Sequence, residues 1–255
     1  MPSKIKRIVR IFEDGEELAL GARDWLLERL TEDQEDASKP FTIALSGGST
    51  PKRLYQLLGE LPQGKVDWTR IRLIWGDERN VAQDHPDSNF GMVKNNLLNF
   101  VPIPSENVLS VRNPGGDPEL AAREYEQDLK NAGIEHADVV LLGIGDDVHT
   151  ASLFPETKAL QVQNRLVVEN WVPKLDCWRI TLSASFINQS RRVAFLIGGS
   201  AKTEALHTLW HGTFEPEQFP AQLIQPESGT LDFLLDAPAI DGLRPPQPHE
   251  IIEAQ

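Results

Sequence analysis

The segment 140–155 constrains the fold of this chain more than any other part of the sequence. Its apolar run, Val140-Leu141-Leu142, is followed at once by two glycines, two aspartates and a histidine. Such a run predicts a buried parallel strand that delivers polar groups to the carboxyl edge of a sheet. Because histidine titrates near neutrality, His149 could accept and return a proton there, and Asp147 could fix its tautomer. The alternative is a strand-to-helix turn with a solvated acidic tip.

Strand-like apolar stretches alternate with helical patterns along most of the 255 residues. We expect strands at 41–45, 71–75, 137–142, 166–169, 178–183 and 193–197, and helices at 15–37, 51–59, 88–100, 119–132 and 200–211. This alternation predicts an α/β fold with one mostly parallel, doubly wound (Rossmann-like) sheet and helices on both faces. We expect a single domain over residues 1–244 and a loosely ordered tail over 245–255, where Pro245, Pro246 and Pro248 cluster.

Charge and cysteine content narrow the class of protein. The net charge is −13, from 25 basic and 38 acidic residues, which argues against nucleic acid as a partner. Cys177 is the one cysteine, so neither an internal disulfide nor a cysteine metal cluster can form. We see no signal peptide and no apolar run of membrane-spanning length. The sequence therefore predicts a soluble cytoplasmic protein that does not bind membranes and is a monomer or weak homodimer.

A glycine-rich junction follows the first expected strand of the sheet. The sequence Ser46-Gly47-Gly48-Ser49-Thr50-Pro51 opens a helix, with Pro51 suited to the first helical position and Thr50 to the N-cap. Paired glycines let the backbone approach a ligand, and the free amides at a helix N-terminus attract anions such as phosphate. The segment is neither a P-loop nor a dinucleotide fingerprint. We favour phosphate binding over a merely structural capped turn.

Two further junctions carry cationic side chains. Asp77-Glu78-Arg79 follows the strand at 71–75, and Arg79 offers a forked donor for a phosphate, a carboxylate or a developing oxyanion. Lys202 follows Gly198-Gly199 in the first turn of a helix, where the helix dipole disfavours a cation unless an anion lies beside it. The alternatives are a surface ion-pair loop around 79–89 and a solvated lysine at 202.

Together these residues resemble the 6-phosphogluconolactonase family, within the superfamily that also contains the glucosamine-6-phosphate deaminases. The resemblance covers about 43–235 and includes the phosphate loop at 46–51, the DERxVPxxHxDSN segment at 77–89, and the later blocks at 179–182, 199–202 and 220–223. His149-Thr150-Ala151-Ser152-Leu153-Phe154-Pro155 matches the lactonase signature, whereas the deaminases have HIAFNEP there. The family pattern around it, GxGxDGHTASLFP, has glycine where this chain has Val148.

The resemblance implies hydrolysis of 6-phospho-D-glucono-1,5-lactone to 6-phosphogluconate in the oxidative pentose phosphate pathway, without metal or organic cofactor. His149 would activate water, Asp147 would orient His149, and Arg79 would hold the substrate or stabilise the oxyanion. The phosphate would lie on the loop from Ser46 through Gly47, Gly48 and Ser49 to Thr50, with Arg179 and Lys202. Loop support would come from Asp77, Glu78, His85, Asn89, Gly143 and Gly145.

Two alternatives to an active lactonase remain open at this stage. One is a sugar-phosphate isomerase or deaminase on the same scaffold. The other is a catalytically impaired sugar-phosphate-binding protein, because a β-branched residue at 148 is strained if the backbone there has positive φ.

Overall fold

The structure is a computed structural model that describes residues 6–32, 39–112, 115–246 and 250–253. Its main sheet has eight strands in the order β11-β1-β10-β9-β6-β2-β3-β5, and every pair of neighbours is parallel. These strands are β1 Lys6–Phe12, β2 Phe41–Leu45, β3 Ile71–Trp75, β5 Val108–Leu109, β6 Val139–Leu142, β9 Arg192–Ile197, β10 Thr230–Asp236 and β11 Glu250–Glu253.

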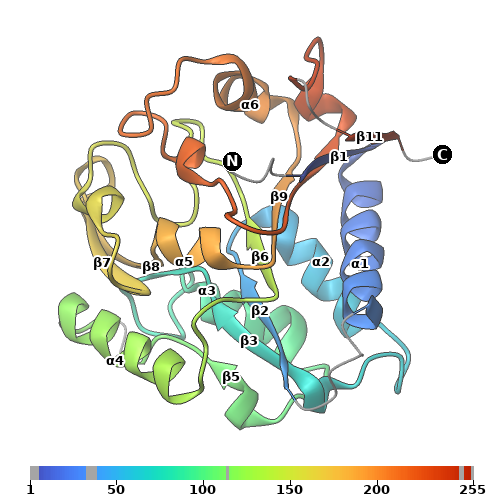
Figure 1. Cartoon of the computed structure of the whole chain (residues 1–255). Coiled ribbons are helices and arrows are strands. Elements are labelled where there is room, and N and C mark those ends of the chain that lie inside the picture. Colours follow the sequence, from blue (N-terminus) through green and yellow to red (C-terminus); the bar gives the residue numbers. More distant parts are fainter. Residues whose placement is uncertain (1–5, 33–38, 113–114, 247–249, 254–255) are drawn as a thin grey trace.

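The α-helices pack against this sheet on both sides, as Figure 1 shows, with α1 and α2 on one side and α4 and α5 on the other. Their bounds are α1 Gly15–Glu32, α2 Ser49–Gly59, α3 Asn89–Val93, α4 Pro118–Asn131, α5 Ala184–Gln189 and α6 Thr203–His211. The predicted α/β class and parallel sheet are confirmed. Every residue of β2 and β6 is buried, because helices cover both faces of these strands.

A second, antiparallel sheet was not expected from the sequence. It contains β4 Asp77–Arg79, β8 Cys177–Leu182 and β7 Val167–Val172, in that order. β4 follows β3 after the single residue Gly76, whose amide still bonds to Leu45 O at 2.8 Å. The small sheet is therefore connected directly to the carboxyl end of β3 in the main sheet.

Several predicted boundaries differ from the structure. Helix α2 begins at Ser49 with Gly48 as its N-cap, so the prediction of Thr50 as the cap is wrong. The helix expected at 88–100 is α3 followed by a π-helical turn, Lys94–Leu98. In the segment 245–255, predicted to be loosely ordered, Glu250–Glu253 pair with β1. The helix predicted over 15–37 is found as far as Glu32, and 33–37 lie outside the described residues.

Two buried tyrosines close the carboxyl ends of neighbouring strands. The Tyr55 hydroxyl accepts a hydrogen bond from Ser46 N at 3.0 Å and donates one to Ser46 O at 2.8 Å. Tyr125 does the same at the end of β3, accepting from Trp75 N at 2.6 Å and donating to Trp75 O at 3.1 Å. Each phenol satisfies backbone groups that the sheet no longer pairs, at the point where a functional loop begins.

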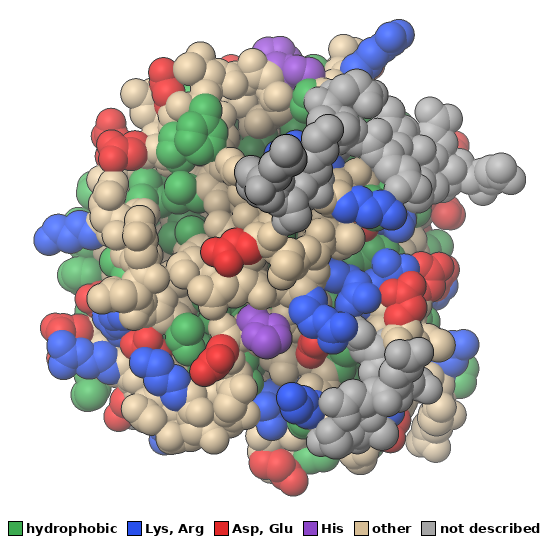
Figure 2. Space-filling model, viewed as in Figure 1, with side chains coloured by type: hydrophobic (Ala, Val, Ile, Leu, Met, Phe, Trp, Pro, Cys, Tyr) green, Lys and Arg blue, Asp and Glu red, His purple; other side chains and the backbone are tan. Residues whose placement is uncertain are grey.

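The surface carries charges of both signs. Figure 2 shows lysine and arginine side chains interspersed with aspartate and glutamate on one face of the molecule. Among the described residues no helix has the length and apolar character needed to cross a membrane.

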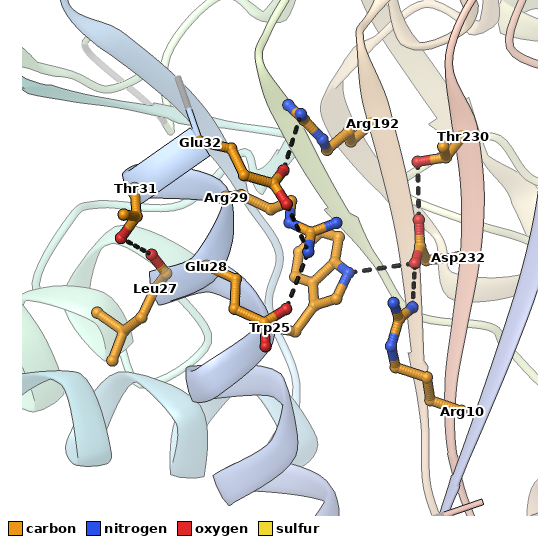
Figure 3. Close-up of polar contacts among 10 residues, drawn as sticks. All are labelled: Arg10, Trp25, Leu27, Glu28, Arg29, Thr31, Glu32, Arg192, Thr230 and Asp232. Carbon is orange, nitrogen blue, oxygen red and sulfur yellow. Dashed lines mark hydrogen bonds and ion pairs between the residues drawn. The ribbon is translucent and has the colours of Figure 1, made fainter. Parts of the chain in front are cut away.

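A buried carboxylate links α1 to the sheet, as Figure 3 shows. Asp232 on β10 is fully buried and accepts hydrogen bonds from Arg10 of β1, from Trp25 Nε1 of α1 at 3.1 Å, and from Thr230 Oγ1 at 2.8 Å. By contrast, Glu28 on the same helix is 63% exposed and pairs with Arg29 at 2.9 Å. Removing a buried, hydrogen-bonded charge costs far more stability than removing an exposed one. We therefore expect Asp232 to contribute more than Glu28 to the stability of the fold.

We predict that Asp232→Ala lowers the free energy of unfolding by about 3–5 kcal/mol, because Arg10 and the Trp25 N–H lose their buried acceptor. Glu28→Ala is the matched control, and we expect it to cost less than about 1 kcal/mol. Urea unfolding followed by circular dichroism measures both. Equal effects of the two variants would contradict this assignment.

Candidate active site

The predicted functional residues gather at the carboxyl ends of four adjacent strands, β9, β6, β2 and β3. Strand connections run outward in opposite directions from β6 and β2, so a topological switch point lies between these two strands, where α/β proteins usually bind ligands. The cavity at this edge has a volume of about 390 Å³. It is lined by Ser46, Gly47, Gly48, Asp77, Arg79, Asn89, Gly143, Ile144, Gly145, Asp146, Asp147, His149, Thr150, Ala151, Phe154, Lys174, Leu175, Arg179 and Lys202.

A larger cavity, of about 1110 Å³, lies at the opposite ends of β2 and β3. Its lining contains acidic and basic side chains together, and none of the predicted site residues. The chemistry of the smaller cavity, rather than size, identifies the candidate site.

His149 and Asp147, two of the predicted site residues, line the cavity and contact each other. His149 Nδ1 lies 2.5 Å from Asp147 Oδ1, and the other oxygen, Oδ2, accepts from Lys174 Nζ at 2.8 Å. Burial opposes ionisation of Asp147, but the hydrogen bonds from Lys174 and His149 outweigh it and lower the pKa of this carboxyl to about 2. Asp147 is therefore a carboxylate at neutral pH, which favours a proton on Nδ1 of His149 and leaves Nε2 as the acceptor.

The ring of His149 lies close to both Phe154 and Gly145. Phe154 stacks on it with 3.9 Å between ring centroids. A side chain at Gly145 would also meet the ring, because a Cβ there would lie 2.0 Å from Nδ1. A side chain at position 145 would therefore displace the ring, so the close approach of His149 requires glycine there.

Val148 has φ +61°, the left-handed conformation in which its β-branched side chain is strained. Two hydrogen bonds maintain it: Val148 N donates to Gly145 O at 3.0 Å, and Val148 O accepts from Ala221 N at 2.9 Å. Its side chain is only 2% exposed and belongs to the hydrophobic core. Burial of about 1.5–3 kcal/mol offsets a strain of about 1–2 kcal/mol. The surrounding structure therefore keeps Val148 in this conformation despite the unfavourable backbone.

The glycine-rich loop reaches the cavity through its first three residues. Ser46, Gly47 and Gly48 line the cavity, whereas Ser49 and Thr50 do not. Gly48 has φ +109° and no side chain caps α2, so the first amides of this helix have no side-chain acceptor. The buried Ser46 Oγ also has no hydrogen-bond partner. These unsatisfied donors are typical of an anion-binding loop.

Within the Asp77-Glu78-Arg79 segment, Glu78 holds the neighbouring helix and Arg79 reaches the cavity. Glu78 is buried beneath α3 and accepts from Asn89 N at 2.8 Å and Phe90 N at 2.7 Å. Burial raises the pKa of Glu78 even though these amides favour its charged form. Arg79 reaches the cavity and donates to Asp87 O, while its buried Nε has no partner. Arg79 is therefore the group of this segment with donor capacity left for a ligand.

Lys202 and Arg179 also line the cavity. Lys202 Nζ lies 2.5 Å from Asp146 Oδ1, and this lysine lowers the pKa of Asp146. Arg179 of β8 lies directly opposite Arg79 of β4 in the antiparallel register, so two arginines occupy neighbouring backbone positions beside the cavity.

His85, another predicted site residue, does not line the cavity. It is exposed, and its Nδ1 accepts from Asp87 N at 3.1 Å.

A buried polar network ties the histidine loop to the small sheet. Ser152 Oγ donates to Asp77 Oδ2 at 2.6 Å, and Ser152 O accepts from Asn170 Nδ2 at 2.9 Å. Asn89 Nδ2 bonds to Asp77 O at 2.9 Å. Ser152 is fully buried, and its hydrogen bonds fix the loop that carries His149. Its role is therefore structural, in agreement with the lack of a nucleophile-elbow motif around it.

Sequence reasoning missed Lys174, Phe154 and Leu175 as cavity residues. Lys174 and Leu175 lie on the turn between β7 and β8, where no recognisable spacing marks them. The stacked partner Phe154 lies inside the HTASLFP motif, so its proximity to His149 was the one available signal. Within the described parts of the chain, no three His, Cys, Asp or Glu side chains are grouped as metal ligands.

Known proteins are similar to this chain over most of its length. A family model described as glucosamine-6-phosphate isomerases/6-phosphogluconolactonase matches residues 13–233. A 6-phosphogluconolactonase of Nostoc is 40% identical over 241 residues, which are 92% of this chain and 98% of that protein. One of Synechocystis is 44% identical over 210 residues, 80% of this chain and 85% of the relative.

Solved structures give the same result. A 6-phosphogluconolactonase from Trypanosoma brucei superposes with a TM-score of 0.84 at 27% identity, covering 94% of this chain and all of that chain. The sequence-based expectations of the family and of an enzyme of this type are confirmed. The chain belongs to the glucosamine-6-phosphate isomerase/6-phosphogluconolactonase family.

Proposed function

We propose that this chain hydrolyses 6-phospho-D-glucono-1,5-lactone to 6-phosphogluconate, within the oxidative pentose phosphate pathway. The observation that carries the proposal is the contact of His149 with the ionised Asp147 in a cavity that also contains Arg79, Arg179 and Lys202. The curated relatives named as 6-phosphogluconolactonases support the choice of substrate.

The proposed reaction begins with removal of a proton from water. Nε2 of His149 takes that proton while the water oxygen bonds to the lactone carbonyl carbon, and the carbonyl oxygen becomes an oxyanion. The ring C–O bond then breaks, and the departing ring oxygen takes the proton from the imidazolium to become a hydroxyl. The products are a carboxylic acid, which ionises, and neutral His149. Asp147 orients the imidazole and stabilises its charged form.

Cationic groups have separate tasks in this proposal. The 6-phosphate lies against the Gly47 and Gly48 amides and the unpartnered Ser46 Oγ at the N-terminus of α2, with Lys202 as counter-charge. Arg79 donates to the oxyanion, because its side chain lines the cavity and its guanidinium has more N–H donors than its hydrogen bond to Asp87 O uses. Arg179 assists phosphate binding from the opposite strand.

We predict that His149→Ala lowers kcat for lactone hydrolysis roughly 10²- to 10⁴-fold, because water loses its general base. Freshly generated lactone must be used with a no-enzyme blank, since the substrate also hydrolyses unaided. Ser105→Ala, an exposed serine remote from the site, serves as control. A His149→Ala enzyme within threefold of the parent would remove His149 from the chemistry.

Arg79 and Lys202 should differ kinetically. We expect Arg79→Ala to lower kcat, because an interaction made with the oxyanion exists only in the transition state. We expect Lys202→Ala mainly to raise KM, because a phosphate contact is present in both states. Steady-state kinetics over a wide range of substrate concentrations separates the two. Purely KM effects from both variants would exclude Arg79 from the oxyanion role.

Val148→Gly tests the impaired-enzyme alternative. Relief of about 1–2 kcal/mol of strain is outweighed by about 1.5–3 kcal/mol of lost burial and about 0.5–1 kcal/mol of glycine chain entropy. We therefore expect the free energy of unfolding to fall by about 1–2 kcal/mol and the parent chain to turn over lactone without the substitution. Denaturant unfolding and the lactone assay check this. Turnover only in the glycine variant would favour the sugar-phosphate-binding protein, and activity on glucosamine 6-phosphate would favour the deaminase.

A further inference from the structure

A lysine outside the predicted site contacts the candidate catalytic pair. Lys174 lies in a 3-10 turn, Pro173–Leu175, at the tip of the β7–β8 hairpin rather than at the end of a strand of the main sheet. Its Nζ is 2.8 Å from Asp147 Oδ2, while Asp147 Oδ1 is 2.5 Å from His149 Nδ1. One carboxylate thus uses one oxygen for the lysine and the other for the histidine.

The hairpin is built to hold this tip in position. Val172 and Cys177 are the last opposed pair before the turn, and Asp176 has the left-handed φ of +48° that reverses the chain. Directly below, Trp171 and Trp178 face each other across the strands with ring centroids 5.4 Å apart. Cross-strand aromatic pairs of this kind stabilise a hairpin. The two indoles are each 39% exposed, and their position gives them a local structural role.

We propose that Lys174 is a positioning residue for His149: Lys174 acts through Asp147 by keeping the carboxylate turned toward Nδ1 of the imidazole. The proposal rests on the proposed function of His149 as general base. Asp147 is the only link needed, because Oδ2 accepts from Lys174 while Oδ1 contacts both Nδ1 and the backbone N of His149, the latter at 3.4 Å. The carboxylate therefore cannot rotate without breaking these contacts.

The charge on Lys174 has a definite sign of effect on His149. An ammonium near the pair disfavours a second positive charge on the imidazole, so it helps to keep His149 neutral and able to accept a proton. Removing it should let His149 retain its proton to higher pH. The other charged side chains that line the same cavity come from the histidine loop, from β4, from β8 and from the turn before α6; they are Asp146, Asp77, Arg79, Arg179 and Lys202.

The rival role for Lys174 is direct contact with the anionic substrate. Its side chain is 66% exposed and lines the cavity, so both roles are sterically open. The two differ in what they change. A substrate contact raises KM and leaves the ionisation of His149 alone, whereas a positioning residue changes kcat and the pH profile.

The test compares Lys174→Met, Lys174→Arg and the control Lys158→Met, whose lysine is exposed and does not line the cavity. We expect Lys174→Met to lower kcat roughly threefold to tenfold and to move the acid limb of kcat/KM upward by roughly 0.3–0.7 pH unit, as one exposed ion pair allows. Lys174→Arg, which keeps the charge, should restore most of both. Lys158→Met should match the parent.

A second readout does not depend on turnover. Proton NMR follows the titration of the His149 ring, assigned by its loss in His149→Asn, and we expect the midpoint in Lys174→Met to rise by the same amount. An unchanged midpoint, or a rise in KM alone, overturns the proposal. If the parent fails to hydrolyse the lactone, the proposed function fails by itself, and the NMR titration still decides whether Lys174 controls His149.

Discussion

The structure depends on one constraint, which is that all neighbouring strands of the main sheet are parallel. Parallel strands bring their carboxyl ends to one edge, and the backbone leaves the ladder there with polar groups unpaired. Side chains supply the missing partners. Tyr55 and Tyr125 bond to the backbone at the ends of β2 and β3, and the Asp236 carboxylate accepts from Gly199 N at 2.9 Å after β9. The turns that carry the cavity residues are therefore fixed from beneath.

At this edge, buried polar side chains hold the loops in place, and other polar side chains line the cavity. Glu78 and Ser152 use their hydrogen bonds to hold α3 and the histidine loop, which leaves Arg79 and His149 directed at the cavity. Val148 shows that this framework tolerates local backbone strain. Its positive φ is unfavourable, yet two backbone hydrogen bonds and a buried side chain keep it in place. Strain at this position is compatible with an ordered neighbouring His149.

Much of this arrangement could be predicted from sequence, because strong apolar runs followed by glycine mark buried parallel strands. The strands at 41–45 and 71–75 match β2 and β3 at both ends, and the contact of His149 with Asp147 follows from their spacing on one turn. The antiparallel sheet could not be predicted, because β4 is only three residues long and all three are polar. Its partner, β8, lies about 100 positions later in the sequence. Lys174 was missed for the same reason: only the pairing of β7 with β8 brings it to Asp147.

The two tyrosines closing β2 and β3 are the only ones in the sequence, and both are fully buried. Burial also raises the pKa of each hydroxyl, so neither readily forms the phenolate that electrophilic reagents attack. The folded chain consequently offers no accessible phenol for nitration, iodination or kinase modification. Any tyrosine chemistry on this protein would report that the edge carrying its cavity has opened.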